Sequence, residues 1–180
     1  MQVAENVVPA GVWSSDTTHS SIGFEVEHMG VSIFVARFTG FDAELVVGEG
    51  GVELRGSVHA DSVDIQDEIL RAHVLASDFL EADRYPELRF HSTSVEVNGD
   101  DLVVSGDLTI KDATRQIEAR GALTPVVSDP TGNVRIGLTL QATIDRTDYG
   151  LDFQLPMPDG TPALGNDVAL VVSLELVRGA

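Results

Sequence analysis

The stretch Val134-Arg-Ile-Gly-Leu-Thr-Leu-Gln-Ala-Thr-Ile144 places an apolar residue at every second position. Successive side chains of a β-strand point to opposite faces of a sheet, so this period of two predicts a strand with one buried and one exposed face. It is the clearest alternation in the chain, and similar patterns recur before and after it. The sequence therefore predicts an all-β protein.

Eight segments carry this alternation and are predicted to be strands. They are residues 19–29, 32–47, 52–61, 87–97, 102–110, 114–124, 134–144 and 166–178. The second of them is long or bent. Eight antiparallel strands with one apolar face each fit either a sandwich or a closed up-and-down barrel. Because short turns such as Asn98-Gly99 join most neighbouring strands, we expect the barrel.

One long segment, residues 61–92, lacks the alternation. Its apolar residues at helical spacing are Ile65, Ile69, Ala72 and Ala76. That spacing predicts a short helical insertion near residues 64–82, with Asp64 as its N-cap. Pro86 returns the chain to extended geometry. Such an insertion in a run of strands covers a sheet edge or closes one end of a barrel.

Length and composition indicate one domain. The chain has 180 residues, 43% of them hydrophobic, which is enough to bury a real core. We expect a single domain over residues 11–178, preceded by an N-terminal tail, residues 1–10. The sequence has no cysteine, which excludes disulfides, thiolate nucleophiles and cysteine-ligated zinc. The tail has no basic start and no apolar run, so we expect a cytoplasmic protein; a chain renumbered from a processing site would be periplasmic or secreted.

The charge balance is strongly acidic. Eleven Lys and Arg against 29 Asp and Glu give a formal net charge of −18. This charge repels phosphate backbones and anionic lipid surfaces, so we expect no nucleic-acid partner. No stretch is long enough for stable membrane insertion, and the acidity is interpreted as a surface that keeps the protein soluble. The oligomeric state stays open, with a homodimer among the options.

Small residues recur among the positions predicted to face inward. They are Ala43, Gly56, Ala60, Gly106, Ala119, Gly121 and Ala142. The interior of an eight-stranded barrel is either filled by side chains or holds one slender ligand. Small inward side chains favour a cavity, although glycine in a strand also marks bends and bulges.

The sequence predicts no catalytic or metal site. The histidines lack the spacing of a compact metal site; they are His19, His28, His59, His73 and His91. Asp16, His19 and Ser20 contain the residue types of a hydrolase triad, but neighbours in one strand alternate faces and cannot converge. No G-x-S-x-G motif is present. We therefore expect no enzyme, no cofactor and no metal.

Two polar groups each allow two interpretations. His28 shares a face with Phe24, so it is either a hydrogen-bonded core histidine or a contact for a ligand head group at the barrel mouth. Arg146 lies between Asp145 and Asp148. The three residues form a structural ion-pair cluster beside a bend, or the planar guanidinium of Arg146 contacts a phosphate.

Several motifs, in order along the chain, resemble those of the YceI family. They are Trp13-Ser-Ser-Asp-Thr-Thr-His19-Ser20, Phe24-Glu-Val-Glu-His28, His73-Val-Leu-Ala-Ser-Asp78-Phe79, Tyr85-Pro86-Glu-Leu-Arg-Phe90, Ser105-Gly106-Asp-Leu108-Thr109-Ile110 and Thr143-Ile-Asp145-Arg146-Thr-Asp148-Tyr149-Gly150. The resemblance covers about residues 11–178. This chain departs from the family pattern at Ala36, where Gly is common, at Leu70-Arg71, where Arg-Asp is common, and at Tyr149, where Phe is usual.

The resemblance implies a fold and a function. Members of the YceI family adopt a lipocalin-like eight-stranded barrel and are known as polyisoprenoid-binding proteins. For this chain the resemblance implies non-enzymatic binding of a long-chain amphiphilic lipid in an apolar interior. Such a lipid is a polyisoprenoid, an isoprenoid quinone or a fatty-acid-like molecule. The candidate ligand-binding residues of lumen and mouth are Ile22, Phe24, Val26, His28, Phe38, Phe41, Phe79, Phe90, Leu108, Leu138, Arg146, Tyr149 and Phe153.

Two alternatives to lipid binding stay open. The first is a lipid-modifying enzyme that uses His28 or Tyr149 at the mouth. The second is a scaffold without a ligand, which would have a filled interior and an exposed apolar patch elsewhere.

Two connections are large enough to cover a barrel end, Asp61 to Pro86 and Thr147 to Gly165. Their aromatic residues are Phe79, Tyr85, Tyr149 and Phe153. Aromatic side chains on such connections form a lid over an apolar mouth, or else they pack a permanently closed end. The sequence does not decide between a lid and a permanently closed end.

Overall fold

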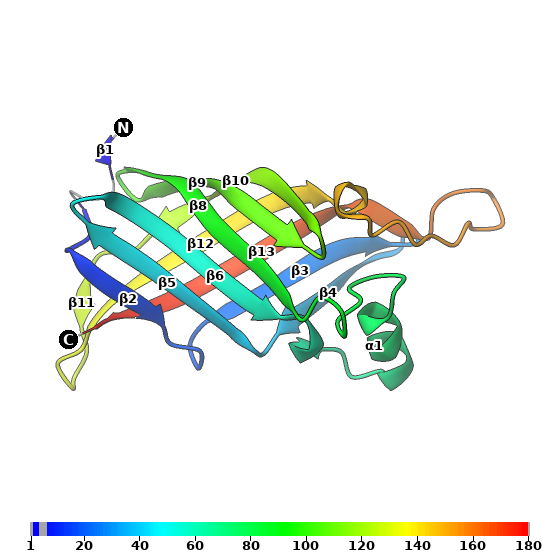
Figure 1. Ribbon diagram of the computed structural model, residues 1–180, viewed down its shortest axis with the longest axis horizontal. Coiled ribbons are helices and arrows are strands. Elements are labelled where there is room, and N and C mark those ends of the chain that lie inside the picture. Colours follow the sequence, from blue (N-terminus) through cyan, green and yellow to red (C-terminus); the bar gives the residue numbers. More distant parts are fainter. Residues whose placement is uncertain (1, 4–6, 180) are drawn as a thin grey trace.

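The alternating segments become strands of one closed antiparallel sheet in the computed structural model, which describes residues 2–3 and 7–179 (Figure 1). The long strands are β2 (Gly11–Ser15), β3 (Ser21–His28), β4 (Ser32–Phe38), β5 (Phe41–Gly48), β6 (Gly51–His59), β8 (Glu87–Asn98), β9 (Asp101–Ile110), β10 (Ala113–Leu123), β12 (Val134–Asp145) and β13 (Leu164–Arg178). Three two-residue strands, β1 (Gln2–Val3), β7 (Val63–Asp64) and β11 (Val127–Ser128), extend its edges. The predicted strands agree with these bounds within about two residues at most ends.

Closure of the sheet depends on β13, which pairs with β12 along one edge. Along its other edge, β13 pairs with β3 through Val168–Ser173 and with β2 through Leu176–Arg178. Strands β2 and β3 therefore act as one interrupted strand, and so do β4 and β5. The wall then has eight positions, and the last strand pairs with the first. This arrangement confirms the barrel and excludes the sandwich.

The predicted long strand over residues 32–47 is bent, at Thr39-Gly40. Here the backbone N–H of Thr39 donates to the carbonyl of Ser62 at 3.0 Å, and the N–H of His59 donates to the carbonyl of Gly40 at 2.9 Å. These bonds hold the bend against the 3-10 turn η2 (Ala60–Ser62). A Cβ on Gly40 would lie 3.1 Å from Cβ of Ser62, so the close approach favours glycine.

One end of the barrel is filled by inward-facing side chains. Trp13 is fully buried there, and its indole N–H donates to the carbonyl of Pro9 at 3.0 Å. Val8, which falls in the predicted tail, is only 2% exposed and belongs to the same cluster. Other members are Leu45, Val47, Leu54, Val97, Leu102, Val104, Leu123, Ile136, Leu138 and Leu176. We call this set, with Trp13 and Val8, the plug.

The helical insertion is confirmed, but its predicted N-cap and buried face are wrong. Helix α1 spans Glu68–Leu75, and Asp67 caps it by accepting a hydrogen bond from the N–H of Leu70 at 2.8 Å. Asp64 is not the cap because it lies in β7, opposite Arg37 of β4. Ile69, the centre of the predicted apolar stripe, is 84% exposed. The helix instead turns Leu70, His73 and Val74 towards the barrel.

Figure 1 places β2 and the end of β13 at the plugged end of the barrel, and α1 at the opposite end, which the long loop that precedes β13 also reaches. That loop follows the 3-10 turn η3 (Arg146–Tyr149). Within the described residues, no helix is long and apolar enough to cross a membrane. The two connections expected to cover a barrel end therefore both lie at the end without the plug.

Candidate functional site

The half of the barrel next to α1 encloses a cavity of about 650 Å³. This volume lies inside the usual range of roughly 300–1,000 Å³ for small-molecule sites. The cavity wall is built from the inward-facing positions of the strands, where the period of two brings apolar side chains to one side. A filled interior, the expectation for a scaffold without a ligand, is wrong.

Most of the candidate ligand-binding residues line this cavity. They are Ile22, Phe24, Val26, His28, Phe38, Phe79, Phe90, Leu108, Arg146 and Phe153. Phe24 anchors one wall, because its ring centroid lies 5.9 Å from that of Phe38 and 6.3 Å from that of Phe34. The structure therefore brings these ten residues together around one space.

Three candidates do not line the cavity. Phe41 and Leu138 pack in the plugged half of the core, where they are 5% and 2% exposed. Tyr149 is 2% exposed and packs in the core cluster near η3. Its phenolic oxygen is enclosed and has no hydrogen-bond partner in the described structure. Burial raises the pKa of Tyr149 to about 12.

Small residues contribute to the cavity less uniformly than predicted. Ala43, Gly56, Ala119 and Ala142 line it. Gly106 makes room for an aromatic ring instead, since a Cβ at this position would lie 2.5 Å from the ring of Phe90. Gly121 accommodates a neighbouring strand, as a Cβ there would lie 1.7 Å from the carbonyl oxygen of Thr139.

Three aromatic side chains meet where α1 approaches the loop before β13. The imidazole of His73 lies 4.6 Å from the ring of Phe153 and 5.1 Å from the ring of Phe79, in both cases edge to face. The rings of Phe79 and Phe153 are 5.3 Å apart. All three line the cavity, and we call them the aromatic gate. Of the other predicted lid aromatics, neither Tyr85 nor Tyr149 reaches it.

Within the aromatic gate, His73 also has a polar partner. Its Nε2 lies 3.2 Å from a carboxylate oxygen of Asp78, which is half exposed. The motif His73-Val-Leu-Ala-Ser-Asp78-Phe79 contains all the parts on the α1 side of this arrangement. Sequence reasoning used that motif only for the family resemblance and missed His73 as a cavity residue.

His28 occupies the last position of β3, where it lines the cavity and is exposed to solvent. The interpretation as a buried core histidine is therefore wrong. The structure places His28 at the mouth.

Arg146 is 3% exposed and lines the cavity from η3. Its Nε donates to the carbonyl of Gly165 at 2.9 Å, and its Nη1 donates to the carbonyls of Leu151 and Phe153, the latter at 3.0 Å. Burial lowers the pKa of Arg146, opposed by the charges of Asp152 and Asp145.

The predicted ion-pair cluster of Asp145, Arg146 and Asp148 is wrong. Asp145 instead caps η3, because its carboxylate accepts hydrogen bonds from the N–H of Thr147 at 2.9 Å and from the hydroxyl of Thr147 at 2.6 Å. The guanidinium of Arg146 points to backbone carbonyls, so the bend is held by capping and backbone bonds.

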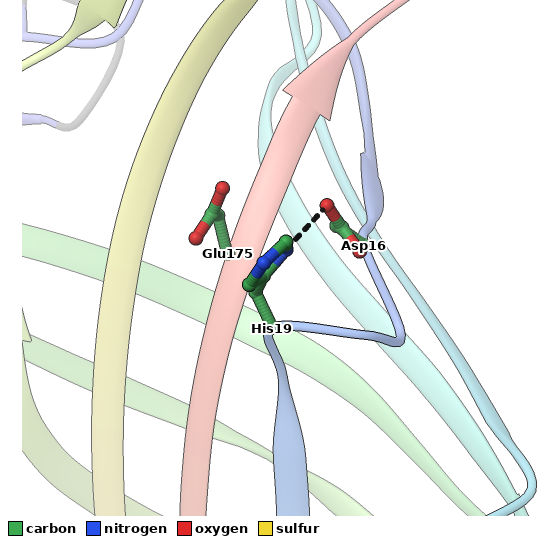
Figure 2. A group of neighbouring side chains, drawn as sticks. All are labelled: Asp16, His19 and Glu175. Atoms are coloured by element: carbon green, nitrogen blue, oxygen red, sulfur yellow. Dashed lines mark hydrogen bonds and ion pairs between the residues drawn. The ribbon is translucent and has the colours of Figure 1, made fainter. Parts of the chain in front are cut away.

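A second polar cluster lies outside the cavity, where the turn after β2 meets β13 (Figure 2). Nδ1 of His19 lies 2.9 Å from a carboxylate oxygen of Asp16, and one ligand-type atom from each of Asp16, His19 and Glu175 falls within 4.8 Å of the others. The prediction that Asp16 and His19 cannot converge is wrong, since residues 16–20 form a turn and not a strand. Ser20 turns away and accepts a hydrogen bond from the N–H of Glu175 at 2.9 Å.

Arg135 supplies the positive charge of this cluster. Its guanidinium lies 2.7 Å from Asp129, 2.8 Å from Asp16 and 2.7 Å from Glu175. Hydrogen bonds from His19 and Arg135 hold the pKa of Asp16 well below its usual range, and Arg135 does the same to Asp129. Asp16 in turn raises the pKa of His19. We call these five residues the seam network, because they join β12, β13 and the turn after β2.

The chain matches a family model described as the YceI-like domain over residues 13–176. A UPF0312 protein of Pseudomonas aeruginosa and protein YceI of Escherichia coli are each 29% identical to it over 163 residues, which are 89% of this chain and 82% of the relative.

Solved structures share the architecture at lower identity. BcnA of Burkholderia cenocepacia superposes with a TM-score of 0.72 at 18% identity, covering 89% of this chain and 98% of that one. A YceI protein of Campylobacter jejuni gives a TM-score of 0.72 at 21% identity, covering 92% and 96%. A domain from Saccharophagus degradans, described as polyisoprenoid binding, gives 0.70 at 15% identity, covering 93% and 98%. These likenesses independently support the barrel.

Proposed function

Because this chain belongs to the YceI-like domain family, we propose that it is a binding protein for a long-chain amphiphilic lipid, held tail-first in the barrel. The ligand classes that fit are a polyisoprenoid, an isoprenoid quinone or a fatty-acid-like molecule. The solved Saccharophagus degradans domain of the same architecture is described as polyisoprenoid binding, which supports an isoprenoid tail here.

The observation that carries the proposal is the cavity of about 650 Å³, with its almost continuous apolar wall. Each methylene group moved from water into such a wall contributes roughly 0.8 kcal/mol, so a tail of many carbons binds firmly with few polar contacts. The plug closes the far end of the barrel around the fully buried Trp13. A tail therefore enters from the α1 side and ends against the plug.

The aromatic gate is the proposed entrance. Phe79 and Phe153 come from two different connections and touch each other across the mouth at 5.3 Å between ring centroids. Both are half-buried, and neither connection is tied into the barrel by strand pairing at these residues. Separating the rings opens the cavity without breaking the sheet, as a lid requires.

Binding without chemical conversion suits the groups at this site. Tyr149, one of the two residues considered for catalysis, has its hydroxyl enclosed in the core and away from the cavity wall. His28 stands at the solvent-exposed rim. His73, whose Nε2 lies 3.2 Å from a carboxylate oxygen of Asp78, is itself part of the aromatic gate and packs edge-on against the ring of Phe153.

The direct test is to fill the cavity. Ala142 faces inward from β12 and lines the cavity, while the next residue, Thr143, is exposed on the outer face. We expect Ala142→Phe to reduce the lipid recovered by native mass spectrometry several-fold, while Thr143→Phe retains it. Equal lipid content in both variants would contradict binding in the lumen.

Incubation with prenyl and fatty substrates tests the enzyme alternative. We expect extraction after prolonged incubation to return the added molecules chemically unchanged and partly protein-bound. Recovery of a new product that accumulates with time would instead establish catalysis.

A further inference from the structure

Three arginines border the cavity, and two of them are neutralised by carboxylates. Arg55 lies 2.7 Å from Glu44, and Arg89 lies 3.1 Å from Glu87. Both of these arginines have more than half of the side chain exposed. Arg146 differs in both respects: it is 3% exposed, and none of the carboxylates in the described structure lies within 4.0 Å of its guanidinium.

The bonds of Arg146 leave part of its guanidinium unused. A guanidinium carries five N–H donors. Nε and Nη1 bond to the backbone carbonyls of Gly165, Leu151 and Phe153, whereas Nη2 bonds to no group in the described part of the chain. Nη2 is also not among the enclosed atoms without partners, for which Tyr149 supplies the only described example. Since Arg146 lines the cavity, its Nη2 donors are available to a molecule inside it.

A buried positive charge without a counter-charge is costly, and the cost falls when an anion binds it. Burial lowers the pKa of Arg146, which reports the same unfavourable surroundings for the charged form. An arginine nevertheless stays protonated in proteins. The remaining donors of Arg146 therefore match an acceptor that brings a negative charge.

We propose that Arg146 anchors the anionic head group of the bound lipid, a carboxylate or a phosphate, with the apolar tail running from there to the plug. This inference rests on the proposed lipid-binding function and narrows its ligand class. Arg146 lies at the α1 end of β12, so an anionic group on it places the tail along the strands. Planar guanidinium donors suit both oxyanions, so the structure names their shared chemistry.

Arg146 is also linked to the aromatic gate. Arg146 donates to the carbonyl of Phe153, whose ring contacts His73 and Phe79. Phe153 therefore connects the two: its carbonyl accepts from Arg146, and its ring belongs to the gate. In a purely structural role, Arg146 would fix this loop equally well whatever the charge of the ligand.

Pairs of probes with one tail and different heads separate these roles. We expect delipidated wild-type protein to bind palmitate more tightly than hexadecanol, and farnesyl phosphate more tightly than farnesol. The expected ratio is on the order of 10- to 100-fold, the range for hydrogen bonds to charged groups. Equal affinity within both pairs overturns the anchor and leaves lipid binding intact. Failure of all four probes to bind counts against the proposed function itself.

Two variants assign the effect to this residue. Arg146→Met should bring the affinity for palmitate down to that for hexadecanol, while Arg120→Met, which removes an exposed charge on β10, should keep the wild-type ratio. Arg146→Lys should retain part of the preference because it keeps the charge. If Arg146→Met does not fold, Arg146→Lys decides: a palmitate-to-hexadecanol affinity ratio below that of the wild type supports the anchor, and a ratio equal to that of the wild type overturns it.

Inorganic phosphate is the last probe, because it carries the same chemistry without a tail. We expect millimolar phosphate to leave palmitate binding unchanged, since the tail supplies most of the affinity. Competition by phosphate at this level would assign the site to a free oxyanion and overturn the lipid head group.

Discussion

The ring of Phe153 stands edge-on to the imidazole of His73, with 4.6 Å between centroids and an interplanar angle of 87°. The two residues are 80 positions apart in the sequence and come from the two connections that reach the unplugged end of the barrel. Both residues line the cavity, so this contact lies at the proposed entrance. Mutating Phe153 can therefore distinguish a lid that opens from an end that is permanently closed.

Phe153→Ala should act mainly on ligand exchange. Phe153 is half-buried and its ring contacts His73 and Phe79, so we expect a loss of about 1–2 kcal/mol of stability, the scale of an aromatic contact with modest burial. A fully packed closing residue would cost roughly 3–5 kcal/mol. Stopped-flow displacement of a fluorescent fatty acid should show faster release. Tyr85→Ala, on the same connection as Phe79 but off the cavity wall, should leave release unchanged.

Tyr149→Phe should preserve or raise stability. The phenolic hydroxyl of Tyr149 is enclosed without a partner, and an unsatisfied buried donor costs on the order of 1–3 kcal/mol. Removing it is expected to increase the free energy of unfolding by about 1 kcal/mol, measured in urea, with lipid content unchanged. A marked loss of bound lipid would mean that the hydroxyl serves the ligand, in line with a catalytic role for Tyr149.

Patterns of period two predicted the strands, because every strand has one face against the interior and one against solvent, and the short turns between them favoured the barrel over the sandwich. The same reasoning left open a bend within 32–47, which the structure has, and it named several of the residues that line the cavity. It failed for Leu138, because alternation tells which side a residue faces but not its depth along the barrel axis. Leu138 and Leu140 share a face of β12, yet only Leu140 reaches the cavity.

The sequence-based predictions failed at the polar residues for a different reason. Arg146 bonds to carbonyls 5, 7 and 19 residues away, in a loop whose path the sequence does not specify. The seam network joins Arg135 to Asp16, 119 residues apart. Such partners become neighbours only after the barrel closes. In α1 the stripe through Ile69 misled because helical spacing shows which residues share a face but not which face packs on the barrel, and the structure turns Leu70, His73 and Val74 inward.

Gly121→Ala should be among the most destabilising single changes in the sheet. A Cβ at Gly121 would lie 1.7 Å from the carbonyl oxygen of Thr139, a backbone atom of the paired strand β12. The strands must separate to admit it, and we expect a loss of about 3 kcal/mol or more, as for severe overpacking. Gly48→Ala is the matched control, because nothing lies within 4 Å of its Cβ position. Similar urea midpoints for the two variants would contradict the close approach.

The seam network should give the protein a stability maximum in mildly acidic solution. The pKa values of Asp16 and Asp129 are lowered from their usual 3.8 in the folded state, so their contribution is present above that pH and is lost as the pH falls. The pKa of His19 is raised from its usual 6.5, so its contribution is present below that pH and is lost as the pH rises through the raised value. The window in which all three contribute lies between these two usual values.

Two variants separate the limbs of this profile. Arg135→Gln should flatten the acid limb in urea unfolding series, because Asp16 and Asp129 lose the partner that they share. His19→Gln should flatten the alkaline limb and reduce the acid limb only in part, since Asp16 keeps Arg135. These groups are solvent-accessible, so added salt should weaken both limbs in the wild type. A profile that keeps its shape in Arg135→Gln would show that other carboxylates govern the acid limb.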